Sequence, residues 1–166
     1  GIMKVNTNPI IISGSNYGKP ALVNELAKFK PNKQDIVIFY YSGHGFRKSN
    51  TPLANLPKDA IFPHLDLRAN YKQDYMKESL GIDSVYRTIL AKGARFNLVI
   101  GDCCNATVGD PNTVSPPPGV PRGPELQKNM RNIETLFLSN TPTSILATAA
   151  NVQELASSNN SFGGFF

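Results

Sequence analysis

The sequence of 166 residues predicts a single α/β domain with a mostly parallel central sheet and helices on both of its faces. Three short apolar runs do not alternate with polar residues, which is typical of strands buried on both faces; they are residues 36–41, 96–100 and 144–149. Amphipathic stretches precede and separate these runs. An alternation of strands and helices favours parallel strands joined by helical crossovers.

The helices are predicted from apolar residues that recur three or four positions apart. Pro20 suits the first turn of the first helix, because the N–H that it lacks has no partner there. The three expected helices cover residues 20–29, 82–90 and 126–137. Two further strands are expected, at residues 8–13 and from residue 163 onward.

Two long irregular segments, residues 46–58 and 107–124, each follow a predicted strand directly. Parallel strands end at the same edge of a sheet, and open α/β folds bind ligands at this carboxyl edge. Loops longer than about 12 residues in a compact domain are usually functional or disordered. We therefore expect the functional site at this edge.

Composition and charge argue against several classes of partner. The formal net charge is +5, but the basic residues are scattered and form no Lys/Arg block, so nucleic-acid binding is not expected. The longest apolar run, residues 36–41, is far shorter than the roughly 20 residues that span a bilayer. No signal-peptide pattern begins the chain. We expect a soluble, cytoplasmic protein without membrane contact.

Residues suited to catalysis follow two of the predicted strands. Ser42-Gly-His-Gly-Phe46 ends the first, and Gly101-Asp-Cys-Cys-Asn105 ends the second. An imidazole beside a thiol converts the thiol into a nucleophilic thiolate. Cys103 and Cys104 cannot form a relaxed disulfide, because consecutive Cα atoms are only about 3.8 Å apart. Adjacent strand residues point to opposite sides, so only one of the two cysteines can face His44.

The motif Tyr41-Ser-Gly-His-Gly45, followed by Leu98-Val-Ile-Gly-Asp-Cys-Cys-Asn105, resembles the caspase-like clan of cysteine peptidases. The likeness is greatest to the metacaspase and bacterial caspase-like branch, and it extends from about residue 35 to residue 166. It implies a three-layer caspase-like fold for a single domain, residues 1–166. Against the family pattern, the first strand and the end of the last strand are expected to be missing from this chain.

The resemblance implies a role for four residues. Cys104 would be the nucleophile and His44 the general base and acid, and the backbone amides of Gly45 and Cys104 would hold the oxyanion. Asp102 matches the metacaspase position that lines the pocket for the residue before the scissile bond. A carboxylate there selects Arg or Lys in a peptide or protein substrate. The alternative for Asp102 is that it caps the following turn.

Departures from the family pattern leave a second function open. Asn105 stands where metacaspases commonly have His, and the acidic cluster that binds Ca²⁺ in many metacaspases is missing. A catalytically inactive caspase-like interaction or scaffold module is therefore the alternative. A zinc site formed by His44, His64 and the two cysteines is disfavoured, since adjacent cysteines do not chelate easily. No metal and no cofactor is expected, and His64 is interpreted as structural.

Three basic residues lie in or just after the proline-rich segment that follows the proposed nucleophile: Arg122, Lys128 and Arg131. If the enzyme cuts after basic residues, these three are candidate sites of self-cleavage. The alternative is that they are solvated surface charges.

Overall fold

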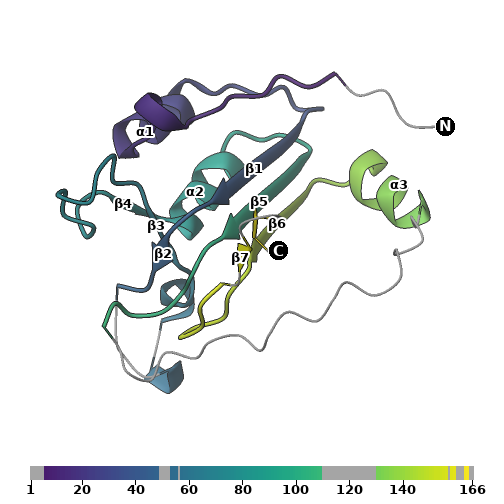
Figure 1. Cartoon of the computed structure of the whole chain (residues 1–166). Helices are drawn as coiled ribbons and strands as arrows, with labels where there is room; N and C mark the ends of the chain where they lie inside the picture. The colour runs from purple at the N-terminus through teal and green to yellow at the C-terminus, as the bar shows by residue number, and fades with distance from the viewer. Residues whose placement is uncertain are drawn as a thin grey trace.

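A computed structural model describes residues 6–48, 53–55, 57–109, 130–156, 158–159 and 163–164 (Figure 1). Its central sheet contains β1 (Ile36–Ser42), β5 (Phe96–Asp102) and β6 (Thr143–Thr148), with β5 in the middle. Both strand pairs are parallel. The three apolar runs of the sequence therefore form one parallel sheet, as predicted.

The described helices occupy the predicted stretches: α1 (Lys19–Lys28), α2 (Ile82–Leu90) and α3 (Met130–Leu138). Pro20 lies in the first turn of α1, as expected. Residues 126–129 of the third predicted helix lie outside the described residues. Within the described part of the chain, no helix has the length and apolar character that crossing a membrane requires.

A second, antiparallel sheet was not predicted. It contains β2 (Gly45–Phe46), β3 (His64–Asp66) and β4 (Ser79–Gly81), with β3 in the middle. Short 3₁₀ helices occur at Gly14–Asn16, Leu53–Asn55 and Lys58–Ile61. Because β2 begins directly after His44, this small sheet fixes the path of the chain beyond that residue.

The hydrophobic core lies where α2 packs against the central sheet. Ile82 and Val85 of α2 are completely buried, and so is Val99 of β5. Leu65 of β3 joins the same core and links the small sheet to the large one. Burying a side chain of this size stabilises a fold by roughly 1.5–3 kcal/mol. The strand ends that carry the predicted site therefore belong to a well-packed unit.

The prediction that all three strands are buried on both faces holds for β5 but is wrong for β1, and every residue of β6 is only partly buried. Val37 and Tyr41 are buried, but Ile38 and Tyr40 on the other face are each 57% exposed. On β5, by contrast, the consecutive residues Phe96 and Asn97 are both buried. The difference follows from position, because β5 has a strand on each side whereas β1 has one neighbour among the described residues.

Two further strand predictions need correction. Residues 8–13 form no strand, and Ile10 and Ile11 within them are exposed. An apolar run forms a strand only where a neighbouring strand supplies partners for its backbone hydrogen bonds. The strand expected from residue 163 is β8 (Gly163–Gly164), which pairs with β7 (Ser158–Asn159) and not with the central sheet. Residues 165–166 lie outside the described residues.

Candidate active site

The segments that carry His44 and Cys104 leave the sheet side by side. In the parallel pairing of β1 with β5, Ser42 is opposite Asp102. The backbone N–H of Gly43 then donates to the carbonyl oxygen of Asp102 at 3.3 Å. Pairing therefore continues one residue past the end of β1, and the two motifs meet at the carboxyl edge, as the sequence predicts.

Gly45 brings the histidine segment into direct contact with both cysteines. A Cβ atom at this position would lie 2.5 Å from Cys103 Sγ and 2.7 Å from the carbonyl oxygen of Cys104. Distances this short exclude any side chain at Gly45 unless the backbone moves. The glycine that follows His44 thus permits its backbone to touch the residue proposed as nucleophile.

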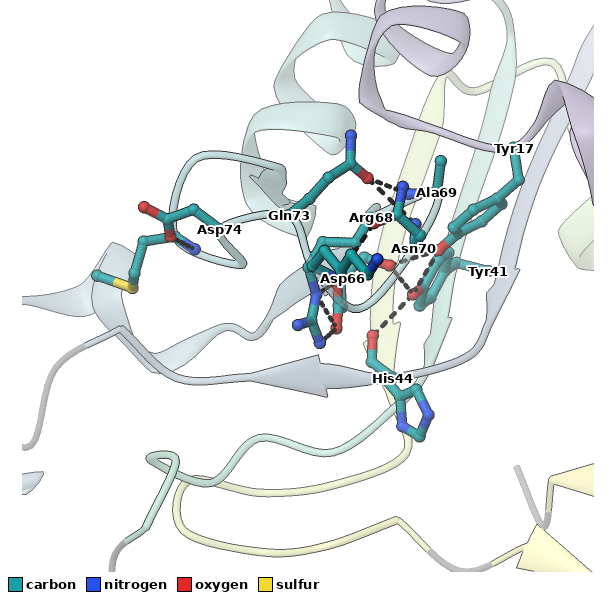
Figure 2. A network of polar contacts seen from close by, with 11 residues as sticks. Tyr17, Tyr41, His44, Asp66, Arg68, Ala69, Asn70, Gln73 and Asp74 are labelled. Atoms are coloured by element: carbon teal, nitrogen blue, oxygen red, sulfur yellow. Dashed lines mark hydrogen bonds and ion pairs between the residues drawn. The ribbon is translucent and has the colours of Figure 1, made fainter.

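The backbone of His44 is anchored from the side opposite its imidazole. Its carbonyl oxygen accepts from the Tyr41 hydroxyl at 2.7 Å and from the Asp66 N–H at 2.9 Å. Figure 2 shows the imidazole pointing away from these contacts. Tyr17 donates to the carbonyl oxygen of Asp66 and lies beside the Tyr41 hydroxyl, 3.1 Å away. Burial raises the pKa of Tyr41, so this hydroxyl stays neutral and remains a hydrogen-bond donor.

Beside the tyrosines, Asp66 and Arg68 form an ion pair (Figure 2). The Arg68 guanidinium donates to both carboxylate oxygens, at 2.9 Å from Nε and 2.6 Å from Nη2. Burial alone would raise the pKa of the Asp66 carboxyl, but the hydrogen bonds from Arg68 outweigh it and the pKa falls below its usual range. Asp66 is therefore ionised and paired, which suits a supporting role and not proton transfer.

A pocket of about 390 Å³ opens beside His44. Eight residues line the pocket: Tyr17, Ser42, Gly43, His44, Asp66, Arg68, Asn70 and Tyr71. Sequence reasoning missed the lining residues outside the histidine motif. They come from two separate segments, Tyr17 and residues 66–71, and no spacing in the sequence relates these segments to the histidine motif.

The two cysteines lie in different surroundings. Cys103 is 1% exposed and belongs to the hydrophobic core. Its burial, together with the nearby Cys104 and Asp102, raises the pKa of the Cys103 thiol to about 12. Cys104 is half-buried, and its sulfur accepts a hydrogen bond from the Ala156 N–H at 3.4 Å. Only one of the two thiols, that of Cys104, therefore lies outside the hydrophobic core, and both cysteines follow Asp102, the last residue of β5.

The residues on either side of the cysteines are buried and hydrogen-bonded. Asp102 is 5% exposed, and the hydroxyl of Tyr40 donates to its Oδ2 at 3.1 Å. Asn105 is 1% exposed, and its Nδ2 donates to the carbonyl oxygen of Ile61 at 2.8 Å. Asn105 thus holds the segment before β3 against the end of β5, which is a structural task.

Some predicted residues do not enter this description. Arg122 and Lys128 lie outside the described residues, and of Arg131 only the backbone, within α3, is described. His64 stacks on the ring of Phe46, with the ring centroids 5.9 Å apart. Across the described ranges, no group of three or more His, Cys, Asp or Glu side chains is placed to hold a metal ion.

A half-buried cysteine and a histidine thus lie on neighbouring segments of one sheet edge, in a chain whose motifs resemble those of caspase-like cysteine peptidases. The comparisons with known proteins agree, because a family model described as the caspase domain of peptidase family C14 matches residues 13–166. The chain therefore belongs to the caspase-domain family, a family of cysteine peptidases that act on proteins or peptides. No curated protein and no solved structure matches the chain significantly.

Proposed function

We propose that this protein is a cysteine endopeptidase in which Cys104 is the nucleophile and His44 the general base and acid. One observation carries the assignment to Cys104. Of two adjacent thiols at the end of β5, Cys103 is sealed in the core, whereas Cys104 is half-buried at the edge that also carries His44. The contact of Gly45 with the Cys104 carbonyl supports the pairing of the two segments.

The reaction follows from the chemistry of the two side chains. His44 takes the thiol proton, and the Cys104 thiolate attacks the peptide carbonyl carbon. When the tetrahedral intermediate collapses, the C–N bond breaks and His44 gives its proton to the departing amine. A thioester remains. Water then attacks the thioester while His44 takes a proton from it, and the acid product leaves as the thiol is restored.

We assign the oxyanion to the backbone amides of Gly45 and Cys104. Amides fixed before the reaction stabilise the developing charge without having to reorganise. The His44 carbonyl, which Tyr41 and Asp66 anchor, belongs to the same peptide unit as the Gly45 N–H. Its two hydrogen bonds therefore limit the rotation of that N–H, which supports this role for Gly45.

Cleavage after Arg or Lys is the proposed specificity, with Asp102 as the selecting carboxylate. Asp102 is nearly buried and accepts from the neutral hydroxyl of Tyr40. Among the described residues, no Lys or Arg side chain forms an ion pair with it. A buried carboxylate favours a cationic partner, which a basic substrate side chain would supply. On the same basis Arg122, Lys128 and Arg131 are proposed sites of self-cleavage.

The proposal includes a single domain with the three-layer arrangement of the caspase-like fold and helices on both faces of the sheet. Two contacts on β5 support it. Val99 packs in the core with Ile82 of α2. Phe96 lies an odd number of residues away and therefore points to the other face. Its ring centroid is 5.0 Å from that of Phe137 in α3.

Fluorogenic peptides that end in Arg, Lys or Asp test the activity and the specificity together. We expect turnover of the Arg and Lys peptides, its loss after treatment with a thiol alkylator, and an adduct that maps to Cys104. Faster cleavage of the Asp peptide would contradict the role of Asp102. The absence of turnover with every peptide, together with slow alkylation, would overturn the enzyme proposal and favour the inactive scaffold module.

Self-cleavage has its own test. Mass spectrometry of stored protein should reveal cuts after one or more of the three basic residues, and a Cys104→Ala variant prepared in the same way should stay intact. Identical fragments in both proteins would overturn self-processing but leave cleavage of other substrates untouched.

A further inference from the structure

The segment that follows β6 brings a backbone N–H to the sulfur of Cys104. The donor is Ala156, whose nitrogen lies 3.4 Å from Cys104 Sγ although the two residues are far apart in the sequence. Ala156 belongs to neither of the motifs that identified the site. The contact therefore adds a group to the candidate active site that the sequence did not indicate.

Two backbone hydrogen bonds dock this segment on the residue after Cys104. The N–H of Asn105 donates to the carbonyl oxygen of Glu154 at 2.9 Å, and the N–H of Gln153 donates to the carbonyl oxygen of Asn105, also at 2.9 Å. The bonds run in both directions between Asn105 and the segment, so they fix its distance and its register. Cys104 thus lies next to a point at which the two chain segments are tied together.

The docked segment contains a closed turn, residues 151–154, just before Ala156. The N–H of Glu154 donates to the carbonyl oxygen of Asn151 at 3.1 Å, and the Glu154 carboxylate accepts from the Asn151 N–H at 2.8 Å. Gln153 has a φ of 70°, a left-handed conformation that few residues other than glycine adopt. These hydrogen bonds hold the turn in this uncommon shape two residues before Ala156.

We propose that the Ala156 N–H is a catalytic backbone group that orients the Cys104 sulfur and stabilises its thiolate form. A donor aimed at an ionisable group favours the charged form, and the thiolate is the reactive form of cysteine. Gln153 is a positioning residue, because it acts through the shape of the turn. This inference rests on the proposed peptidase function, but its test does not depend on turnover.

The sharpest test removes the N–H and nothing else. Replacing Ala156 by lactic acid converts the amide to an ester and keeps the methyl group. We expect the rate of Cys104 alkylation by iodoacetamide at pH 7 to fall by about 3- to 10-fold. At pH 10, where thiols ionise without help, the difference should disappear. A loss of folding would lower or raise the rates at both pH values, so the pH dependence distinguishes stabilisation of the thiolate from a structural effect.

An ester at Ala91 is the matched control, because its N–H donates to the carbonyl oxygen of Arg87 at the end of α2, away from Cys104. Alkylation of the control should follow the wild-type pH profile. A second pair of variants avoids the ester: Gln153→Val disfavours a positive φ, whereas Gln153→Gly permits it. We expect the valine variant to be alkylated more slowly at pH 7 than the glycine variant.

The outcomes separate this inference from the proposed function. If the wild-type protein cleaves peptides but the Ala156 ester is alkylated with the wild-type profile, the inference is overturned and the peptidase stands. If no peptide is cleaved but the ester still slows alkylation at pH 7 alone, the contact acts on the thiol as proposed and the peptidase assignment fails.

Discussion

Cys103 and Cys104 are neighbours in the chain, yet they lie in two regions with opposite properties. Cys103 points into the core formed by α2 and the sheet and is 1% exposed. Cys104 is half-buried just after the end of β5, and its sulfur receives a backbone hydrogen bond from Ala156. Burial raises the pKa of the Cys103 thiol to about 12, so this thiol stays protonated at neutral pH. Burial therefore distinguishes a packing residue, Cys103, from the candidate nucleophile one position further along the chain.

The largest expected effect tests that separation directly. Cys104→Ala should reduce the turnover of an Arg or Lys peptide by at least about 1000-fold, because the nucleophile is gone. Cys103→Ala should retain turnover and lower the free energy of unfolding by about 1 kcal/mol, because a buried sulfur is removed. Steady-state kinetics and urea denaturation of both variants measure the two effects. Equal turnover in the two variants would contradict the assignment.

Gly45 touches both cysteines and thus links the two regions. Gly45→Ala would place a methyl group 2.5 Å from Cys103 Sγ and 2.7 Å from the backbone oxygen of Cys104. Relieving such overlap costs about 1–3 kcal/mol of folding free energy. It also moves the histidine segment away from Cys104, so turnover should fall as well. Thermal unfolding and peptide kinetics give both values.

Gly93→Ala is the control for this substitution. Gly93 has a φ of 77° but no atom within 4 Å of an added Cβ, so alanine there meets backbone strain without a clash. It should lose about 1 kcal/mol of stability and retain turnover. A Gly45→Ala variant with wild-type turnover would show that the close approach is not needed for activity.

The raised pKa of Cys103 predicts a loss of stability at high pH. In the unfolded chain the thiol ionises near pH 8.5, whereas in the folded protein it stays protonated up to about pH 12. Between these values the folded state holds the additional proton, and its stability falls as the pH rises. The slope due to this group approaches about 1.4 kcal/mol per pH unit.

Cys103→Ala should therefore lose less stability between pH 8 and 10.5 than the wild-type protein, and Cys104→Ala serves as the matched comparison. Urea denaturation at several pH values gives the slopes. Equal slopes for Cys103→Ala and wild type would mean that the folded protein does not hold the Cys103 proton.

The sequence was sufficient to predict the helices and strands that local patterns of apolar residues determine. The three strands and the helices follow from periodicity, and the ends of the strands predicted that the segments carrying His44 and Cys104 meet at one edge of the sheet. The burial of β1 was mispredicted, because an apolar run such as residues 36–41 does not reveal whether a strand has neighbours on both sides. The same reason explains residues 8–13, where an extended run has no strand beside it.

The parts of the site that the sequence did not indicate all depend on contacts between distant segments. Tyr17, Tyr41 and Asp66 come together only after the segment before α1 has packed against β1 and β3. Ala156 reaches Cys104 because Asn105 pairs with the turn after β6. No spacing rule predicts such contacts, and the residue types involved, a backbone amide above all, carry no sequence signal.

The smallest expected effect concerns the other histidine and extends the comparison from thiols to imidazoles. Burial, with a contribution from Lys48, lowers the pKa of His64, so the folded state binds a proton less readily than the unfolded chain. As the pH falls below about 6.5, the unfolded state gains a proton that the folded state does not, and stability decreases.

His64→Phe keeps the stacking on Phe46 and removes the titrating group. Urea denaturation should therefore show a smaller loss between pH 7 and 5 than in the wild-type protein, and His64→Gln should share this change whatever its absolute stability. If both variants lose as much stability as wild type over this range, another group is responsible for the acid sensitivity.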